Sequence, residues 1–302
     1  MRIMVTGGSG FLGVPLIKKL LELGNVVIGV SRSSCPRSLD GQKLLSWLTL
    51  DLTSDEFKVS NVEDVDAVIH LAGTGWSGGK RLDQSEDYEF LMKSNELSTL
   101  NVLTKYGPIC EKIILASSQV VYGVKDSLCV SEGDCLNPRT PYACAKVNSE
   151  NWARLFQQKH SGKYFSMRFC GFIEGGGFID YLINTAKSNN DISLFSHGNV
   201  CRDYIDIESA VDAIVALAEI ESDEGYFPIN VGSGQSIPAK VFAKIVCREL
   251  QSKSEILLVA QPAPQSNFVY NVSYAKALFN YRPKDIIQTV QAYIKNRNAH
   301  YD

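Results

Sequence analysis

Short apolar runs alternate with longer amphipathic stretches along the first half of the chain. The runs predict buried strands, at Arg2–Thr6, Val26–Val30, Trp47–Leu50, Ala67–Leu71, Lys112–Ser117 and Tyr164–Phe169. Apolar positions at helical spacing predict helices between them, at Leu12–Leu23, Tyr88–Lys105 and Tyr142–His160. Strands that alternate with helices indicate α/β architecture, with a doubly wound parallel sheet and right-handed crossovers.

The organisation changes after about residue 167. The glycine-rich stretch Gly171–Phe178 predicts a loop, and Ile179–Ser188 and Ala239–Leu250 predict helices. A strand-to-helix passage follows from Tyr204 to Ile220, and Pro228–Val231 predicts another strand. We therefore expect a first domain over 1–167, with returns to its sheet near 192–224, and a smaller C-terminal lobe formed mainly by 168–302.

Composition excludes several classes of function. The chain has 302 residues, with 45% hydrophobic, 21% charged and a net charge of −3. Such a chain has no basic field that would hold nucleic acid or an anionic membrane. We find neither an apolar run of about 18 residues nor a signal region. Eight scattered cysteines without a Cys-x-x-Cys pair predict reduced core thiols, no metal site and a cytoplasmic protein.

The segment Thr6–Gly13 lies between the first strand and the first helix and reads Thr-Gly-Gly-Ser-Gly-Phe-Leu-Gly. Glycines allow the tight turn and the close approach of a phosphate, and the helix N-terminus offers free N–H groups. The context is that of a dinucleotide pyrophosphate site, so the sheet is predicted to be Rossmann-type. The candidate cofactor residues of this segment are Gly7, Gly10, Phe11, Leu12 and Gly13.

The end of the second strand is expected to select the cofactor. A site for NAD usually has an acidic residue there, which accepts the ribose hydroxyls. Here the strand is followed by Ser31 and Arg32, which predict a site for a 2′-phosphate and therefore NADP, with NAD as the alternative. Asp51 and Leu52, after the third strand, are expected near the adenine.

Tyr142 and Lys146 are four residues apart on a predicted helix, so their side chains share one face. A phenol with a pKa of about 10 is a poor base at neutral pH, but a neighbouring ammonium favours the phenolate. Tyr142 is then a candidate acid and base for an alcohol or ketone during hydride transfer. Ser118 follows the fifth strand at the carboxyl edge of the sheet, where it is expected to hydrogen-bond the reacting oxygen.

These residues together resemble the extended short-chain dehydrogenase/reductase family, whose members include nucleotide-sugar epimerases, dehydratases and ketoreductases. Further matching segments are Leu71-Ala72-Gly73, Asn95, Ser117–Gly123, Arg202–Asp206 and Asn230–Gly234. The resemblance implies that Leu71, Ala72, Gly73 and Asn95 bind the cofactor beside Tyr142 and Lys146. It also implies a nucleoside-diphosphate sugar as substrate, with Arg202 on the diphosphate and the C-terminal lobe as its binding domain.

The resemblance further implies a homodimer through the helices near Asn95–Tyr106 and Tyr142–His160. Three departures from the family's motifs narrow the choice of reaction. Gln119 and Val120 stand where the family's dehydratases have an Asp-Glu pair, so the groups for water elimination are missing. Arg168-Phe169-Cys170-Gly171 replaces an Arg-Tyr-Phe-Asn sequence of many 4-epimerases, and Gln261 replaces a second diphosphate arginine.

Three functions remain as hypotheses. The first is NADPH-dependent reduction of a nucleotide-linked 4-keto-6-deoxyhexose, with Tyr142 as the proton donor and Ser118 orienting the carbonyl. The second is an NAD-dependent 4-epimerase of the UDP-glucose or UDP-N-acetylglucosamine type, which would use the same residues. The third is a regulator that senses NADP without turnover, which the retained Tyr142 and Lys146 disfavour.

Overall fold

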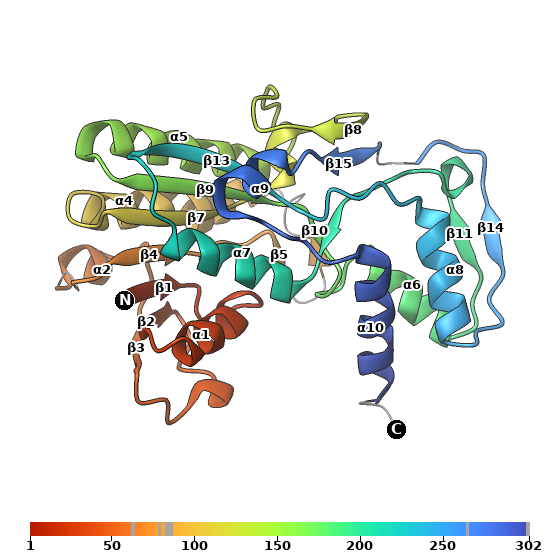
Figure 1. Ribbon diagram of the computed structural model, residues 1–302, viewed down its shortest axis with the longest axis horizontal. Helices are drawn as coiled ribbons and strands as arrows, with labels where there is room; N and C mark the ends of the chain where they lie inside the picture. Colours follow the sequence, from red (N-terminus) through yellow and green to blue (C-terminus); the bar gives the residue numbers. More distant parts are fainter. Residues whose placement is uncertain (62–63, 78–79, 82–86, 264–265, 300–302) are drawn as a thin grey trace. The chain divides into compact units, whose positions relative to one another are not determined.

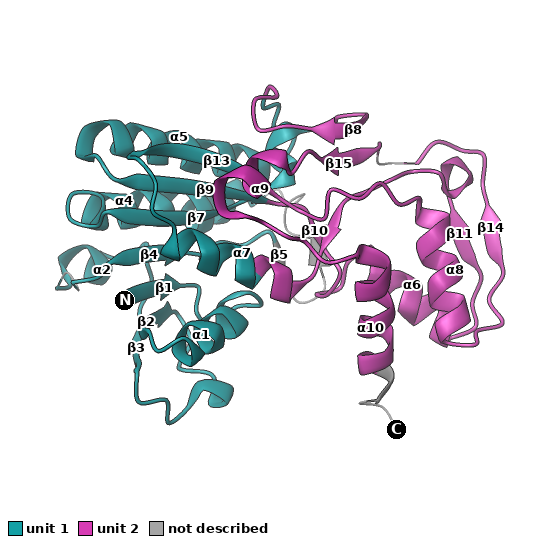
Figure 2. Ribbon diagram, viewed as in Figure 1, with its two compact units in different colours: residues 1–123, 136–168, 211–229 teal, residues 124–135, 169–210, 230–302 magenta. Residues whose placement is uncertain are grey.

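The computed structural model describes residues 1–61, 64–77, 80–81, 87–263 and 266–299. The chain forms two compact units (Figure 2). Unit 1 comprises Met1–Gly123, Leu136–Arg168 and Val211–Ile229, and unit 2 comprises Val124–Cys135, Phe169–Ala210 and Asn230–Asp302.

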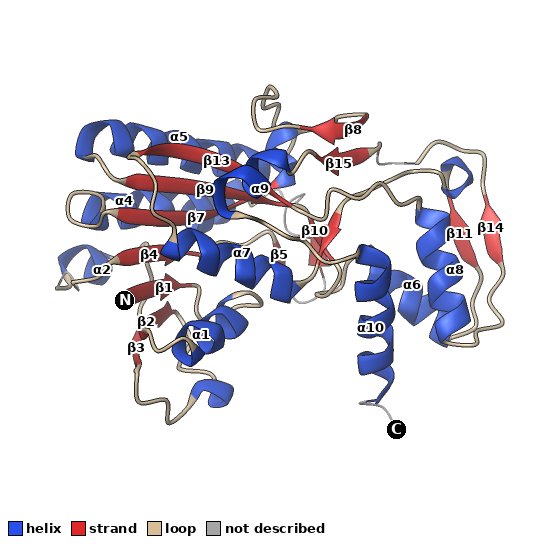
Figure 3. Ribbon diagram, viewed as in Figure 1, coloured by secondary structure: helices blue, strands red, loops and turns tan. Residues whose placement is uncertain are grey.

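A seven-stranded sheet, in the order β13-β9-β7-β4-β1-β2-β3, forms the centre of unit 1 (Figures 1 and 3). Its strands are β1 (Arg2–Thr6), β2 (Val26–Ser31), β3 (Leu45–Thr49), β4 (Ala67–His70), β7 (Lys112–Ser118), β9 (Lys163–Phe169) and β13 (Gly225–Val231). β1 pairs in parallel with both β2 and β4, and Val5 lies opposite Gly29 and Ile69. The strand order reverses at β1 and β4, where doubly wound sheets bind ligands at their carboxyl edge. The predicted α/β Rossmann-type fold is confirmed.

Helices cover both faces of this sheet (Figure 1). α1 (Gly13–Glu22) and α7 (Ile207–Glu219) lie on one face, and α2 (Asp55–Val59), α4 (Ser98–Tyr106) and α5 (Pro141–His160) lie on the other. The second group shares one hydrophobic core with the strands, in which Val102, Phe57 and Ala153 are almost fully buried. Burial of this apolar surface is the main source of stability for the sheet.

The helix predicted over Tyr88–Lys105 is not regular. It consists of α3 (Tyr88–Leu91), a π-helical segment η2 (Met92–Leu97) and α4. Asn95 in this segment donates its side-chain amide to the carbonyl oxygen of Leu91, one turn earlier. Such a side-chain bond competes with the regular backbone ladder, and short π segments are frequent at functional sites. Hydrophobic spacing alone does not distinguish this segment from a continuous α-helix.

Unit 2 contains short strand pairs and helices. The parallel pairs are β10 (Gly171–Phe172) with β12 (Tyr204–Ile205), β11 (Ile192–Leu194) with β14 (Ile256–Leu258), and β8 (Ser127–Val130) with β15 (Phe268–Tyr270). The helices α6 (Phe178–Lys187), α8 (Ala239–Glu249) and α10 (Ile286–Ala299) pack around Ile183, Phe242 and Val290. β11, within the range expected to return to the sheet, pairs with β14 instead. The strand that returns to the sheet is β13.

The remaining elements are short: η1 (Arg37–Leu39), η3 (Gln119–Tyr122), η4 (Ser196–Gly198), α9 (Ser273–Phe279) and the antiparallel pair β5 (Trp76–Ser77) and β6 (Lys80–Arg81). Among the described helices, none is both long enough and apolar enough to cross a bilayer. The eight cysteines are unpaired, and three of them, Cys129, Cys135 and Cys144, are exposed rather than part of a core.

Candidate functional site

The glycine turn after β1 is tightly packed. Gly7 has φ +69° and accepts a hydrogen bond from the Gly10 amide at 2.9 Å, and α1 begins at Gly13. A Cβ at Gly13 would lie 2.2 Å from the Gly7 carbonyl oxygen, and one at Gly7 would lie 2.7 Å from the Ala72 amide nitrogen. The turn therefore leads directly into the helix N-terminus and touches the segment after β4. This arrangement fits the pyrophosphate of a dinucleotide.

The other two residues of this predicted site flank the start of α1. Phe11 is exposed on the turn, and Leu12 immediately precedes the first helical residue. The side chain of Leu12 makes no capping bond, so backbone amides form the helix N-terminus here.

The end of β2 presents polar groups beside this turn. The Ser31 hydroxyl is 2.6 Å from that of Ser9, which ties the strand end to the glycine segment. Arg32 is exposed. Burial opposes ionisation of Asp51, but bonds from Thr53 and the charge of Arg32 outweigh it and hold the Asp51 pKa below its usual value. The Asp51 carboxylate and the serine hydroxyls can bind ribose hydroxyls, and the Arg32 guanidinium can bind a phosphate.

Leu52, by contrast, is buried in the hydrophobic core. Its side chain packs with the strands rather than projecting from the edge of the sheet. Its carbonyl oxygen accepts a hydrogen bond from Asn101 in α4. The structure thus places the Leu52 side chain in the core of unit 1, and its expected position near the adenine stays a prediction.

His70, the last residue of β4, is buried between two threonines. Its Nδ1 is 2.7 Å from the Thr6 hydroxyl, and its Nε2 is 3.1 Å from that of Thr99. Burial, with a smaller contribution from the charge of Lys146, lowers the pKa of His70 to about 3. The neutral ring therefore links β1, β4 and α4 directly beneath the glycine turn.

This histidine predicts an acid sensitivity of the fold. The His70 pKa falls from 6.5 to about 3 on folding, so between these pH values only the unfolded chain binds the proton. Its contribution to the free energy of unfolding should decrease by about 1.4 kcal/mol for each pH unit as the pH falls through this window. Denaturant titrations from pH 7 to 4 should show a shallower pH dependence for His70→Gln than for wild type. The exposed His197, replaced by glutamine, serves as control, and equal slopes for His70→Gln and wild type would contradict the assignment.

Asn95 organises the segment after β4. Its side-chain oxygen accepts from the Thr74 amide and its nitrogen donates to the Thr74 carbonyl, both at 3.1 Å. A Cβ on Gly73 would lie 2.6 Å from this oxygen and 3.0 Å from Lys146 Nζ. Leu71, Ala72 and Gly73 thus run between the glycine turn and Lys146. Thr74, which the sequence did not single out, completes this pair of bonds.

Tyr142 lies in the first turn of α5. Thr140 caps the helix by accepting a hydrogen bond from the Ala143 amide, and Pro141 is its first residue. A Cβ on Gly75 would lie 2.8 Å from the ring of Tyr142, so only a glycine fits there. Lys146, one turn along, has its Nζ 5.8 Å from the centre of the Tyr142 ring. The predicted shared face of these two side chains is present.

Lys146 is the buried charge of this site. Only 5% of its surface is exposed, and its ammonium donates to the Ala116 carbonyl oxygen at 2.9 Å. Burial lowers its pKa to about 8, and the carboxylate of Glu150 opposes this effect. Two residues beyond Ala116, Ser118 ends β7 and its hydroxyl accepts a bond from the Val120 amide at 3.4 Å. Ser118 and Lys146 are thus connected through the same strand end.

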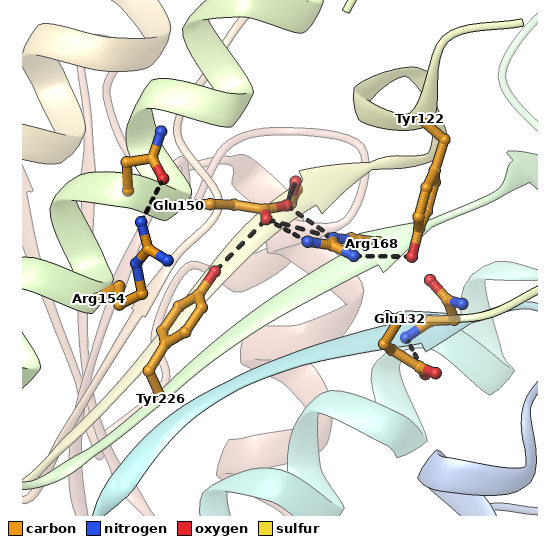
Figure 4. A network of polar contacts seen from close by, with 9 residues as sticks. Tyr122, Glu132, Glu150, Arg154, Arg168 and Tyr226 are labelled. Carbon is orange, nitrogen blue, oxygen red and sulfur yellow. Dashed lines mark hydrogen bonds and ion pairs between the residues drawn. The ribbon is translucent and has the colours of Figure 1, made fainter. Parts of the chain in front are cut away.

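A buried network lies behind these residues (Figure 4). Glu150 accepts from Ser117 at 2.5 Å and from Arg168 at 2.6 and 3.0 Å, and Arg168 donates to the Tyr122 hydroxyl at 2.7 Å. Glu150 and Arg168 are each 4% exposed. We did not single out Glu150 from the sequence, and Arg168 stood out only as part of a departure from a family motif. A signal was present, because Glu150 continues the four-residue spacing of Tyr142 and Lys146.

Arg202 belongs to unit 2. Its guanidinium donates to the Ser266 carbonyl oxygen at 3.1 Å and lies 5.2 Å from the centre of the Phe268 ring. The next residue, Asp203, is buried and accepts bonds from Ser233, Gly234 and Tyr270. Within unit 2, a pocket of about 250 Å³ is lined by Asp126, Ser196, Asn199, Ser266 and Asn267, among others. Val200, Pro262 and Ala263 complete its lining, which is therefore mixed polar and apolar.

Known proteins resemble this chain in sequence and in fold. A model of the NAD-dependent epimerase/dehydratase family matches residues 3–232. The chain is 28% identical to dTDP-4-dehydro-6-deoxyglucose reductase of Escherichia coli, over 94% of this chain and 93% of that protein. It is 26% identical to a UDP-glucose 4-epimerase of Cyamopsis tetragonoloba, over 77% and 76% of the two chains. The solved UDP-glucose 4-epimerase of Thermotoga maritima, with UDP-glucose, superposes with a TM-score of 0.85 at 20% identity, covering both chains completely.

Proposed function

Because this chain belongs to the NAD-dependent epimerase/dehydratase family, we propose that it transfers hydride at a ring carbon of a nucleoside-diphosphate sugar. The reaction we infer is NADPH-dependent reduction of a nucleotide-linked 4-keto-6-deoxyhexose. One observation carries the proposal of hydride transfer: the buried ammonium of Lys146 lies beside the Tyr142 ring and donates to the end of the strand that carries Ser118. The likeness to a dTDP-4-dehydro-6-deoxyglucose reductase over almost the whole chain supports the choice of substrate.

Each residue of unit 1 has a role in this proposal. A bound nicotinamide dinucleotide supplies the hydride. The Tyr142 phenol donates a proton to the sugar oxygen, and Lys146 stabilises the phenolate left behind. Ser118 donates a hydrogen bond to the same oxygen and orients the carbonyl. The turn Gly7–Gly13 holds the pyrophosphate with its backbone amides.

The cofactor preference is proposed to depend on Arg32. Replacing Arg32 by alanine should weaken NADPH binding about tenfold, because a charge-assisted bond to the 2′-phosphate is lost. NADH binding should stay within about twofold, because that cofactor lacks the phosphate. Fluorescence titrations of the two dinucleotides, side by side, measure both affinities. Lys43→Ala removes an exposed cation before the amino end of β3, at the opposite edge of the sheet, and should leave both affinities unchanged. An equal loss for NADH and NADPH in Arg32→Ala would reject the assignment.

The 4-epimerase is the second candidate, and the likeness to UDP-glucose 4-epimerases favours it. The two reactions differ in net redox change, since an epimerase regenerates its own cofactor. The test is to identify any nucleotide that co-purifies and then to follow NADPH oxidation with dTDP-4-keto-6-deoxyglucose. Stoichiometric oxidation supports the reductase. If NAD co-purifies tightly bound and the protein interconverts UDP-glucose and UDP-galactose, the reductase hypothesis is rejected in favour of the epimerase.

Unit 2 is proposed to bind the nucleotide part of the substrate. Arg202 would contact the diphosphate, and the pocket of unit 2, with its mixed polar and apolar lining, would accept the nucleoside. Asp203 supports this role because its buried bonds hold the backbone next to Arg202. We also propose a homodimer through α4 and α5, which the mass in analytical ultracentrifugation would test.

A further inference from the structure

Glu150 occupies an unusual position for a buried acid. It lies one turn after Lys146 and two turns after Tyr142 on the same face of α5, and Arg168 of β9 neutralises it with a bidentate contact. We propose that Glu150, held by Arg168, is a positioning residue for the reaction. It keeps the helix face of Tyr142 and Lys146 in register with the strand end of Ser118, and it keeps Lys146 charged. The effect of Glu150 on catalysis rests on the function proposed above.

The register follows from three consecutive residues at the end of β7. The carbonyl oxygen of Ala116 accepts from Lys146 at 2.9 Å, and the Ser117 hydroxyl donates to Glu150 at 2.5 Å. Ser118, the next residue, is the group proposed to touch the sugar oxygen. Two bonds, one turn apart on α5, therefore connect the helix to the residues directly before Ser118. Such a pair of bonds opposes both sliding and rotation of the helix against the strand.

Further contacts make Glu150 the centre of this arrangement. Arg168 reaches past it to the Tyr122 hydroxyl, in the short helix η3 that begins directly after Ser118. Tyr226 of β13 donates to Glu150 at 3.4 Å. The network thus connects both sides of Ser118 to α5. A misplacement of about 1 Å at a reacting group can cost about 10² in rate, so this register matters for the reaction.

Stability alone does not account for the pair. Both side chains are 4% exposed, and desolvation of such ions costs several kcal/mol each. Hydrophobic residues of similar volume often give equal or greater stability at such sites. The pair instead provides directional bonds and a fixed charge next to Lys146, which apolar packing cannot supply.

The charge acts on Lys146 against its burial. Glu150 is the acidic group that opposes the lowering of the Lys146 pKa. The other groups around Lys146 are Tyr142 on α5 and His70 at the end of β4, whose ring is neutral at physiological pH. Arg168 contacts Glu150 at 2.6 Å and compensates that carboxylate. Without the pair, Lys146 should lose its proton at a lower pH than in the wild type. The Tyr142 phenolate would then lose the stabilisation that the charged ammonium provides.

Two variants separate the two roles. Glu150→Gln/Arg168→Met removes both charges together, so no buried ion is left unpaired, and glutamine still offers an acceptor to Ser117. Ser117→Ala removes the strand-to-helix bond and leaves the ion pair. The control is Lys163→Met, which removes a largely buried cation from the opposite end of β9, where its partners are Glu111 and Glu221.

The first readout is the titration of Lys146 in protein with ¹³C-labelled lysine, with the signal assigned from Lys146→Met. The second is kcat and KM for the keto sugar across pH. In the double variant the Lys146 midpoint should move to lower pH, and kcat should begin to fall at lower pH on the alkaline side. In Ser117→Ala the midpoint should stay and kcat should fall about tenfold, with KM nearly unchanged. Lys163→Met should change neither.

If the titration midpoint of Lys146 does not move in the double variant, the charge role of Glu150 is wrong. If kcat of Ser117→Ala equals that of the control, the register role is wrong. These results are distinct from failure of the proposed function. If wild type reduces no keto sugar, the lysine titration still decides the charge effect, because it needs no substrate. If Tyr142→Phe abolishes turnover while both variants match the control, the reaction stands and the inference about Glu150 falls.

Discussion

Replacing Tyr142 by phenylalanine is expected to lower kcat about 10²–10⁴-fold, the usual contribution of a positioned acid or base. The ring, and its packing against Gly75, are retained, so the fold and the affinity for the dinucleotide should stay close to wild type. Only the hydroxyl that exchanges the proton with the sugar oxygen is lost. Stopped-flow measurement of NADPH oxidation at saturating keto sugar, with a parallel NADPH titration, gives both quantities.

The matched control is Tyr164→Phe. The Tyr164 hydroxyl donates to the Gly107 carbonyl oxygen in the core of unit 1, far along β9 from its carboxyl end. This variant should lose about 1 kcal/mol of unfolding free energy, typical of one buried hydrogen bond, and keep its kcat. Turnover of Tyr142→Phe at the wild-type rate would remove Tyr142 from the mechanism and direct attention to Ser118.

A second large effect is expected at the glycine turn. In Gly13→Ala the new Cβ would lie 2.2 Å from the Gly7 carbonyl oxygen and 2.8 Å from the Gly8 Cα, both backbone atoms. The turn must open to accept it, at a cost of roughly 3 kcal/mol or more. Dinucleotide affinity should then fall at least about tenfold, since 1.4 kcal/mol corresponds to a factor of ten. Thermal denaturation and NADPH titration of the purified variant measure the two losses.

Gly133→Ala is the control for this change. A Cβ at Gly133 meets no atom within 4 Å, so the same substitution there should leave both stability and NADPH binding unchanged. If Gly13→Ala bound NADPH as tightly as Gly133→Ala, the turn could not be the pyrophosphate site. Loss of stability without loss of affinity would show that the turn is packed for the fold alone.

Some of the candidate site could be predicted from the chain because its signals are local. The glycine turn depends on residues within one segment, and Tyr142 and Lys146 depend on the helical repeat of α5. The apolar runs likewise predicted six strands of the sheet at or near their observed positions, whereas β13 was predicted as a strand but not as a member of this sheet. In each case the information lies within about one element of sequence, where spacing and side-chain size determine local geometry.

The tertiary structure decided the contacts between distant segments. The pairing of β1 with β4 brings Thr6 and His70 together, and the packing of helical segments against strands and loops does so for Glu150 and Arg168 and for Asn95 and Thr74. Hydrophobic periodicity says which face of an element is buried, but not which buried polar group of another element it meets. Hydrophobic periodicity likewise does not show the π segment at Asn95, where the side-chain amide bonds to the Leu91 carbonyl oxygen. The sequence by itself thus determined the fold class and indicated the candidate reactive groups. The surroundings of these groups, and with them the charge of Lys146, follow only from the packed chain.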